Sequence, residues 1–374
     1  MKSWGVKVIM GLAAVVLIGG VVLHFYNRRP TQLAEAAPVI LQKADSASSK
    51  NFGARGQTAA SSKEIETPAA KEAANPLAVA REKIEEYLRL HNRDSASLLA
   101  AFHATDAGQG IDYLKEAATT FPGDPHVQLT VLAQDAFPED RRKWLDAFKA
   151  SSPSNSLANY LSARDYFKNN QPEAALKELL EASGKGQFAN YAMETYLGAA
   201  ELSRFGGASP LMANTTAMSA MAGNLLPELA NLKGIAQGIL EVQKQYLNSG
   251  DAASVENLSQ MGTGLANRLT SGDGGRFVIS QLVGIATETI AMRSLDQNTS
   301  YEFLGGKTPA ERLEELKAQK LAVRALSVNF SSAFGNATEA ERDTYTERVK
   351  IYGEVAAMQW LQQQHPANST QGGQ

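Results

Sequence analysis

From about residue 75 to residue 363 the chain carries the spacing and the end signals of α-helices. Asn75-Pro76 reads as a helix cap followed by a first-turn proline, and Ile84 and Leu88 then recur one turn apart. Thr308–Glu311 and Thr338–Glu341 have the pattern in which a hydroxyl and a carboxylate satisfy free backbone amides at a helix start. No stretch alternates apolar and polar residues with a period of two. The sequence therefore predicts an all-α fold.

The predicted helices in the second half of this region differ from those in the first half in their glycine content. Its helices contain glycine at spacings that let neighbouring elements approach closely, as at Gly234, Gly238 and Gly284. Near the end, one apolar stripe at helical spacing predicts a single last helix: Tyr345, Val349, Tyr352, Ala356 and Trp360. We expect residues 187–363 to form a helical bundle, which could be a separate domain or part of a larger one, and residues 364–374 to form a disordered tail.

One uncharged apolar run, Val8–Leu23, stands apart from the rest of the sequence. Trp4 and Tyr26 bracket it, and in a helix they would lie roughly 33 Å apart, close to the thickness of a bilayer core. Residues 1–29 are therefore expected to be a transmembrane anchor that contacts the bilayer through residues 4–26. A cleaved signal peptide is the alternative, but the bulky and basic segment after the run is unlike a cleavage site.

Between residues 30 and 74 the composition shifts to Ala, Ser, Lys, Gln and Glu. So little apolar surface cannot offset the entropy of ordering the chain, which predicts a disordered linker. Basic residues flank the apolar run on both sides, so the charge rule alone does not decide the orientation. A short N-terminal tail before a large polar region favours a single-pass protein of the inner membrane, or an equivalent membrane, with its soluble part in the periplasm.

Between the linker and residue 186 the helical signals recur with a period. Ala117, Ala150 and Ala182 each end a helical stretch, at intervals of about 33 residues, as in solenoids of helix pairs. Residues 153–182 resemble a tetratricopeptide repeat (TPR) at five positions of the family's spacing: Ala163, Tyr166, Ala175, Leu179 and Ala182. They depart from the family's usual residues at Asn159, Asn170 and Pro172. The resemblance implies TPR-like helical hairpins over residues 75–186.

The resemblance also implies a binding face, because the first helix of each TPR unit lines a concave groove. Opposite its packing stripe, the first helix of this unit carries four aromatic and cationic residues: Tyr160, Arg164, Phe167 and Lys168. Such a mixture suits the capture of a protein partner, so these are the predicted partner-binding residues. The alternative is that Tyr160 and Phe167 pack against a neighbouring helix.

The composition argues against several classes of chemistry. Without cysteine there is no disulfide, no thiolate nucleophile and no thiolate zinc site. A formal net charge of −3 supplies no positive field for binding nucleic acid. The five histidines lack metal-ligand spacing, and Gly305–Thr308 resembles the end of a phosphate-binding loop without the strand that should precede it. We expect no nucleic-acid partner, metal, cofactor or catalytic residue.

The expected function is that of a membrane-anchored helical-repeat scaffold or adaptor in the cell envelope, which binds protein partners and is not an enzyme. Two alternatives stay open. One is an envelope hydrolase whose carboxylates only the fold brings together, and the other is a helical receptor for a small apolar ligand. A close pair of buried carboxyl groups would favour the hydrolase, and a sizeable internal cavity would favour the receptor.

Overall fold

The computed structural model describes residues 79–105 and 110–366, which belong to one compact unit, Leu77–Gln374. These residues form α-helices joined by turns, with isolated bridges and no strand among them, so the all-α prediction is confirmed for this part of the chain. None of the described helices combines the length and the apolarity that a membrane span requires. The predicted anchor (1–29, with Trp4 and Tyr26), the linker (30–74) and most of the predicted tail lie outside the described residues.

The N-terminal helices are short. In chain order they are α2 (Arg81–Leu90), α3 (Ser95–Ala104), α4 (Ile111–Thr120), α5 (Pro125–Gln134), α6 (Arg141–Ser151), α7 (Ser156–Lys168) and α8 (Pro172–Ser183), with a 3-10 turn η2 (Pro138–Asp140) before α6. Asp94, Asp124 and Asn155 begin α3, α5 and α7, where each side chain accepts backbone N–H groups of the first turn. The capping residues therefore decide where these helices start.

The later helices are longer. They are α9 (Ala192–Phe205), α10 (Pro210–Ser249), α11 (Ala252–Thr270), α12 (Val278–Ala291), α13 (Pro309–Asn336), α14 (Glu339–Tyr352) and α15 (Glu354–Gln364), with 3-10 turns η3 (Gly274–Arg276) and η4 (Glu302–Leu304). Helices end or begin at the glycine-rich segments Gly206-Gly207, Asn248–Gly250 and Ser271–Gly275. Both predicted capping boxes are present, at the starts of α13 and α14.

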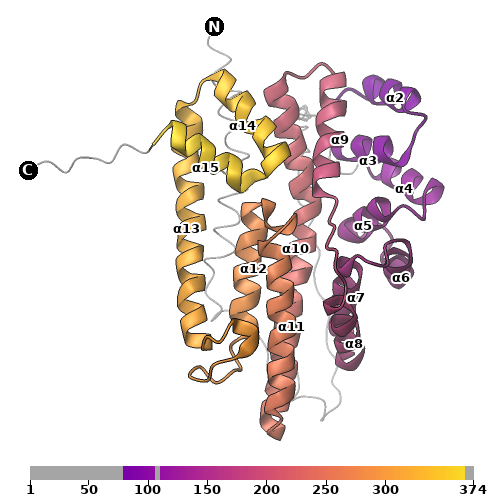
Figure 1. Ribbon diagram of the computed structural model, residues 1–374. Coiled ribbons are helices and arrows are strands. Elements are labelled where there is room, and N and C mark those ends of the chain that lie inside the picture. The colour runs from indigo at the N-terminus through magenta and orange to yellow at the C-terminus, as the bar shows by residue number, and fades with distance from the viewer. Residues whose placement is uncertain (1–78, 106–109, 367–374) are drawn as a thin grey trace, which may run out of the picture. The chain divides into compact units, whose positions relative to one another are not determined.

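Helix α10, 40 residues long, is the element around which the others pack. It contacts α5, α7 and α9 on one side and α11 and α12 on the other, and α14 packs near one of its ends (Figure 1). Helix α13 follows α12 and α15 contacts α13 (Figure 1). The first and second halves of the described chain thus share one central helix.

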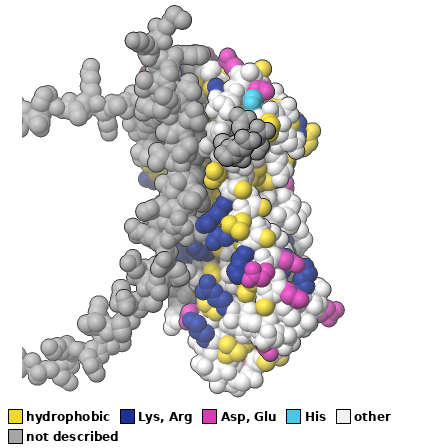
Figure 2. Space-filling view, turned by 90° about the vertical axis from the view of Figure 1, so that its left-hand side faces the viewer, with side chains coloured by type: hydrophobic (Ala, Val, Ile, Leu, Met, Phe, Trp, Pro, Cys, Tyr) yellow, Lys and Arg dark blue, Asp and Glu magenta, His cyan; other side chains and the backbone are white. Residues whose placement is uncertain are grey.

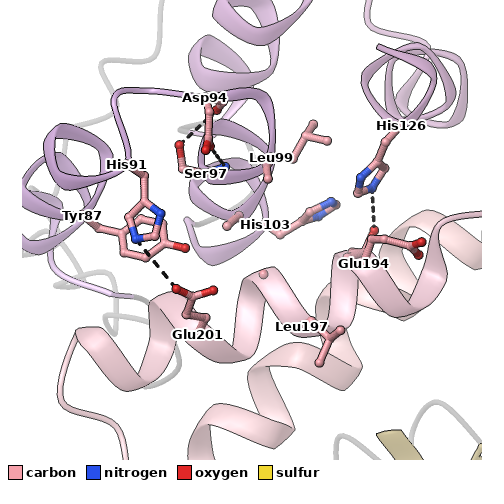
Figure 3. Close-up of a pocket in the computed structure, with 14 residues that line it drawn as sticks. Tyr87, His91, Asp94, Ser97, Leu99, His103, His126, Glu194, Leu197 and Glu201 are labelled. Carbon is pink, nitrogen blue, oxygen red and sulfur yellow. Dashed lines mark hydrogen bonds and ion pairs between the residues drawn. The ribbon is translucent and has the colours of Figure 1, made fainter. Parts of the chain in front are cut away.

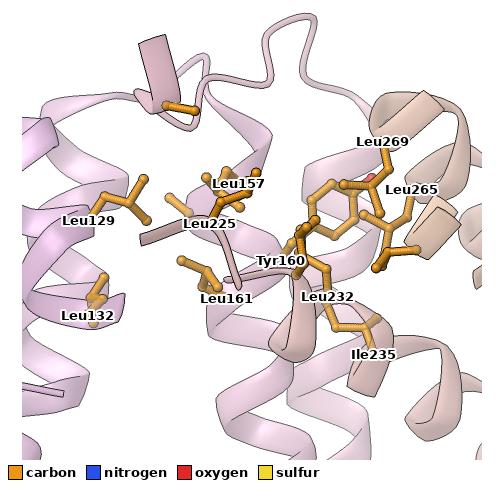
Figure 4. Close-up of a cluster of buried hydrophobic side chains, with 14 of the residues drawn as sticks. Leu129, Leu132, Leu157, Tyr160, Leu161, Leu225, Leu232, Ile235, Leu265 and Leu269 are labelled. Atoms are coloured by element: carbon orange, nitrogen blue, oxygen red, sulfur yellow. The ribbon is translucent and has the colours of Figure 1, made fainter. Parts of the chain in front are cut away.

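The largest hydrophobic cluster fills the space around α10 (Figure 4). Leu161 of α7, Leu232 of α10 and Leu265 of α11 all contribute to it, and each is almost fully buried. Burying apolar side chains from helices that are distant in sequence stabilises their packing by roughly 1.5 to 3 kcal/mol for each such side chain. Packing is therefore continuous across residues 186 and 187, and the domain boundary placed there stays a prediction.

Two glycines of α10 let side chains of α7 lie directly on its backbone. A Cβ atom at Gly234 would lie 2.5 Å from Nε of Arg164, and one at Gly238 would lie 2.6 Å from the ring of Phe167. Both distances are far below van der Waals contact, so only glycine fits beneath these side chains as they stand. The close approach expected at these glycines thus occurs between α10 and α7.

The single last helix expected from residue 345 onward is wrong. The chain turns back at Gly353, whose φ of +88° favours glycine, and α15 packs on α14 as a hairpin. A Cβ atom at this position would also lie 2.8 Å from Cβ of Arg276. The apolar stripe of the sequence runs across the break because α14 and α15 each bury part of it. Tyr352, at the end of α14, is exposed.

Glu228 is a buried carboxyl group in α10, and its Oε1 has no hydrogen-bond partner among the described residues. Burial raises its pKa to about 8, so the folded protein keeps this proton at pH 7, where an unfolded chain would release it. A raised folded pKa means that stability is lost as pH rises from about 4.5 towards 8.

Replacing Glu228 with glutamine is therefore expected to raise the free energy of unfolding by about 3 kcal/mol at pH 7, and by about 1 kcal/mol at pH 5. Urea denaturation at the two pH values measures the difference. Glu241→Gln, on the same helix with a mostly exposed side chain, is the control and should change stability little at either pH. An equal gain for Glu228→Gln at both pH values would show that the carboxyl group is ionised in the fold.

Candidate functional site

Helices α3, α5 and α9 enclose a pocket of about 280 Å³, together with the end of α2 (Figure 3). We call it the imidazole pocket, because His103 of α3 and His126 of α5 point toward each other across it (Figure 3). Tyr87 and His91 line its other end, and α9 supplies Glu194, Thr195, Leu197, Gly198 and Glu201. Polar and apolar groups therefore share the walls, as is usual in small-molecule sites.

The position of His126 follows from the start of α5. Asp124 is the cap residue and accepts the backbone N–H of His126 at 2.8 Å, while Pro125 occupies the first helical position. The ring of His126 stacks on Tyr191 at a centroid distance of 5.2 Å, and its Nε2 lies 3.0 Å from Oγ1 of Thr195. The cap thus fixes the backbone position of His126, and the contacts with Tyr191 and Thr195 fix the orientation of its ring.

A chain of hydrogen bonds fixes the proton of His103. The backbone carbonyl of Gly223 can only accept hydrogen bonds, and it accepts one from Nε2 of Gln134 at 3.3 Å. The same Nε2 donates to Oδ1 of Asn224 at 3.0 Å, so the amide nitrogen of Asn224 faces Nε2 of His103 at 3.2 Å. Since that nitrogen donates, Nε2 of His103 accepts, and the ring proton is on Nδ1. No described residue forms a hydrogen bond with Nδ1.

The sequence explains why the carbonyl of Gly223, at which this series of hydrogen bonds begins, has no partner within α10. Pro227 lies inside α10 and has no N–H, so it cannot make the usual helical bond to the carbonyl four residues earlier, that of Gly223. That carbonyl is left for the side chain of Gln134 on α5. A proline inside a helix therefore helps to set which nitrogen of His103 carries the hydrogen.

Both facing imidazoles are neutral at physiological pH. Burial lowers the pKa of His103 to about 3, and the nearby ring of His126 lowers it further. Burial also lowers the pKa of His126 to about 4, although the carboxylate of Asp124 acts in the opposite direction. The charged groups that line the pocket are then carboxylates, Asp94, Glu194 and Glu201, and its lining includes no lysine or arginine.

A second hollow, of about 610 Å³, lies between α12, α13 and α15. We call it the amide groove, because five side-chain amides line it: Gln281, Gln319, Asn329, Gln359 and Gln362. Apolar lining comes from Ile285, Val323, Leu326 and Val355. Between Leu316 and Phe330 no residue of α13 is buried, so this stretch of the helix stands open to the groove and to solvent.

Helix α13 is fixed at its two ends. Near its start, Arg312 donates from Nε and Nη2 to the two carboxylate oxygens of the buried Glu288 on α12, at 2.7 and 3.0 Å. Near its end, Phe330 packs on Tyr345 of α14 at a ring-centroid distance of 5.0 Å. Figure 2 views the molecule from the left-hand side of Figure 1, where α13 lies, and shows hydrophobic side chains interspersed with Lys and Arg.

The four predicted partner-binding residues all lie on α7 but differ in exposure. Tyr160 is buried at 2 % exposure and belongs to the core cluster. Phe167 packs against that cluster, and the guanidinium of Arg164 lies on Gly234 of α10. Only Lys168 of the four is exposed. The structure thus places this face against α10, which is the packing arrangement weighed as the alternative for Tyr160 and Phe167.

Sequence reasoning missed both hollows. From the sequence, His103 and His126 are only histidines without metal-ligand spacing, and the contacts that orient them come from residues up to 121 positions away. The Asp124-Pro125-His126 cap was the one local signal that fixes a histidine at a helix start. Among the described residues, no group of three or more His, Asp or Glu side chains is arranged to hold a metal ion.

The chain matches no protein-family model, no curated protein and no solved structure. No residue role can therefore be transferred from a relative. The functional argument depends on the chemistry of the imidazole pocket and the amide groove.

Proposed function

We propose that this chain is a membrane-anchored adaptor of the cell envelope, without catalytic activity of its own. Its helical unit binds an extended segment of a partner protein in the amide groove. The apolar run Val8–Leu23 fastens the protein to a bilayer, with the helical unit in the periplasm or an equivalent compartment. The resemblance to a TPR unit falls on α7 and α8, and Ala163, Ala175 and Leu179 are buried there.

The observation that carries this proposal is the set of amides in the groove. Gln319, Asn329 and Gln359 are exposed, and no described residue forms a hydrogen bond with their side chains. Each amide offers both a donor and an acceptor, which matches the alternating N–H and C=O groups of an extended polypeptide. Val323, Leu326 and Val355 are half-buried beside them and provide apolar contact for the partner's side chains.

Three buried carboxyl groups of the described residues bear on the hydrolase alternative: Glu178, Glu228 and Glu288. Glu178 contacts Lys149 at 2.7 Å, and Glu288 is paired with Arg312. Asn190 lowers the raised pKa of Glu228 through a side-chain hydrogen bond. Glu178 and Glu288 are thus each paired with a cation and Glu228 is held neutral by burial, whereas an acid–base pair needs two carboxyl groups at one site. This arrangement favours the adaptor over the hydrolase.

Photo-crosslinking in intact cells tests the groove. A photoreactive phenylalanine analogue at Gln319, inside the groove, is expected to give one discrete adduct with a partner protein. The same analogue at Lys317 is the matched control, because its side chain is 68 % exposed and two residues along a helix turn it to the other side. Gln359→Ala should weaken the adduct from position 319. Equal adducts from positions 319 and 317, or none from 319, would contradict binding in the groove.

The anchor is tested separately by fractionation. The full chain is expected to sediment with membranes and to resist extraction by high salt and carbonate, whereas a variant that lacks residues 1–29 should stay in the supernatant. Protease added to spheroplasts should digest the helical unit if it faces outward. A full chain that stays in the supernatant would remove the membrane part of the proposal and leave the groove part intact.

A further inference from the structure

We propose that the imidazole pocket binds a small organic cation whose far end carries a hydrogen-bond acceptor, with an arylalkylamine that bears a phenol group as the type. This ligand site is separate from the amide groove and does not depend on the adaptor function. It also differs from the apolar ligand weighed from the sequence, because charged groups line the pocket.

The size of the pocket limits the ligand. Its volume of about 280 Å³ is roughly twice the ~150 Å³ that encloses benzene in an apolar cavity, so a molecule of about ten non-hydrogen atoms fits. Leu99, Ala100 and Leu197 form the apolar part of the lining. They offer contact for a ring or a short aliphatic chain, and the polar groups described below surround them.

The charge of the lining selects a cation. Asp94, Glu194 and Glu201 contribute carboxylates, and the lining includes no lysine or arginine that could neutralise them. Glu194 has no ion-pair partner among the described residues. Glu201 lies 3.7 Å from Nε2 of His91, and both are partly exposed. An ammonium group in the pocket would therefore meet unneutralised negative charge at short range.

An aromatic wall adds to this preference. The rings of Tyr87 and His91 lie with their centroids 4.1 Å apart, beside Glu201 and at the end of the pocket away from His103 (Figure 3). Aromatic faces attract cations, most strongly where water is excluded. The ammonium end of the ligand therefore belongs at this wall, between the rings and the carboxylates of α9.

The facing imidazoles specify the other end of the ligand. His103 is partly buried and lines the pocket, its Nε2 lies 3.2 Å from the amide nitrogen of Asn224, and no described residue forms a hydrogen bond with its Nδ1–H. This donor has no partner in the protein, so a ligand that supplies an acceptor there gains a hydrogen bond. A phenol or alcohol oxygen fulfils this role without adding a second charge.

Isothermal titration calorimetry of the full chain with tyramine and with 4-ethylphenol tests the proposal. The two compounds have similar rings and phenol groups, but only tyramine carries an ammonium group. We expect tyramine to bind at least tenfold more tightly than 4-ethylphenol. The double variant E194Q/E201Q, at two exposed positions that should not disturb folding, is expected to weaken tyramine binding at least tenfold, and Glu241→Gln on α10 should leave it unchanged.

Side-chain NMR signals of the histidines locate the binding event. Tyramine is expected to shift the imidazole signals of His103 and His126 in the wild type and not in E194Q/E201Q. Equal affinities for tyramine and 4-ethylphenol, equal weakening by Glu241→Gln, or binding without a shift at His103 would each overturn the proposal. A lack of tyramine binding at millimolar concentration would overturn it as well. None of these results bears on photo-crosslinking at the amide groove, so the two proposals fail independently.

Discussion

Replacing Arg312 with methionine is expected to lower the free energy of unfolding by about 3 to 5 kcal/mol. The guanidinium makes two hydrogen bonds to Glu288, whose side chain is only 3 % exposed, and a third to Glu315. Without Arg312 the carboxylate of Glu288 would stay buried with no cation beside it, and that uncompensated charge is the source of the loss. Urea denaturation at pH 7 measures the change.

Two variants separate this effect from other causes. In R312M/E288M both members of the pair are apolar, so most of the lost stability should return. Lys317→Met removes another cation from the same helix, but Lys317 and its partner Glu314 are both mostly exposed, and little stability should be lost. A double variant as unstable as Arg312→Met alone would mean that the arginine acts through packing and not through the buried charge.

Acid is expected to destabilise the fold through the imidazole pocket, by roughly 4 kcal/mol between pH 7 and pH 4.5 for its two facing histidines together. The folded pKa values of His103 and His126, about 3 and about 4, are below the ordinary value near 6.5. In this interval His103 and His126 become protonated in the unfolded chain but stay neutral in the folded chain, so stability falls as pH falls. Glu228 acts in the opposite sense over the same interval, because its pKa is raised.

A comparison of two proteins isolates the histidines from the other titrating groups. Denaturation of the wild type and of H103Q/H126Q at pH 7 and pH 4.5 gives the pH-dependent loss for each, and Glu228 contributes to both. The double variant is expected to lose about 4 kcal/mol less than the wild type over this interval. Equal losses would mean that the imidazoles are protonated in the fold and that the pocket is wetter than its packing indicates.

The features that the sequence predicted well depend on local chemistry. The capping boxes at Thr308 and Thr338 each involve residues within four positions of one another. Gly353 shows the limit, because its turn requires a positive φ and a close approach to Arg276, whereas the apolar stripe on either side reads as continuous. Periodicity alone cannot separate one long helix from two that pack on each other.

The candidate sites could not be predicted in this way, because distant segments build them. Tyr160 could be either a partner-binding or a packing residue from the sequence, and the structure buries it with residues of α10 more than sixty positions later. The proton on His103 depends on Gln134, Asn224 and a carbonyl freed by Pro227, and no spacing within one helix shows this relationship. The open stretch of α13 is exposed because no other helix packs fully over it, and this depends on how the helices assemble and not on the local sequence.

Because α13 is attached near both of its ends, its middle turns can move more than its ends. Its middle turns can bow outward while the Arg312–Glu288 pair and the Phe330–Tyr345 contact stay closed, provided that the amide of Gln362 on α15 releases the carbonyl of Leu326. The width available to a guest chain is then set by the stiffness of about four helical turns and not by the rupture of an interface. Backbone amides of the middle turns should exchange their hydrogens faster than those near either attachment, and a bound guest should slow them selectively.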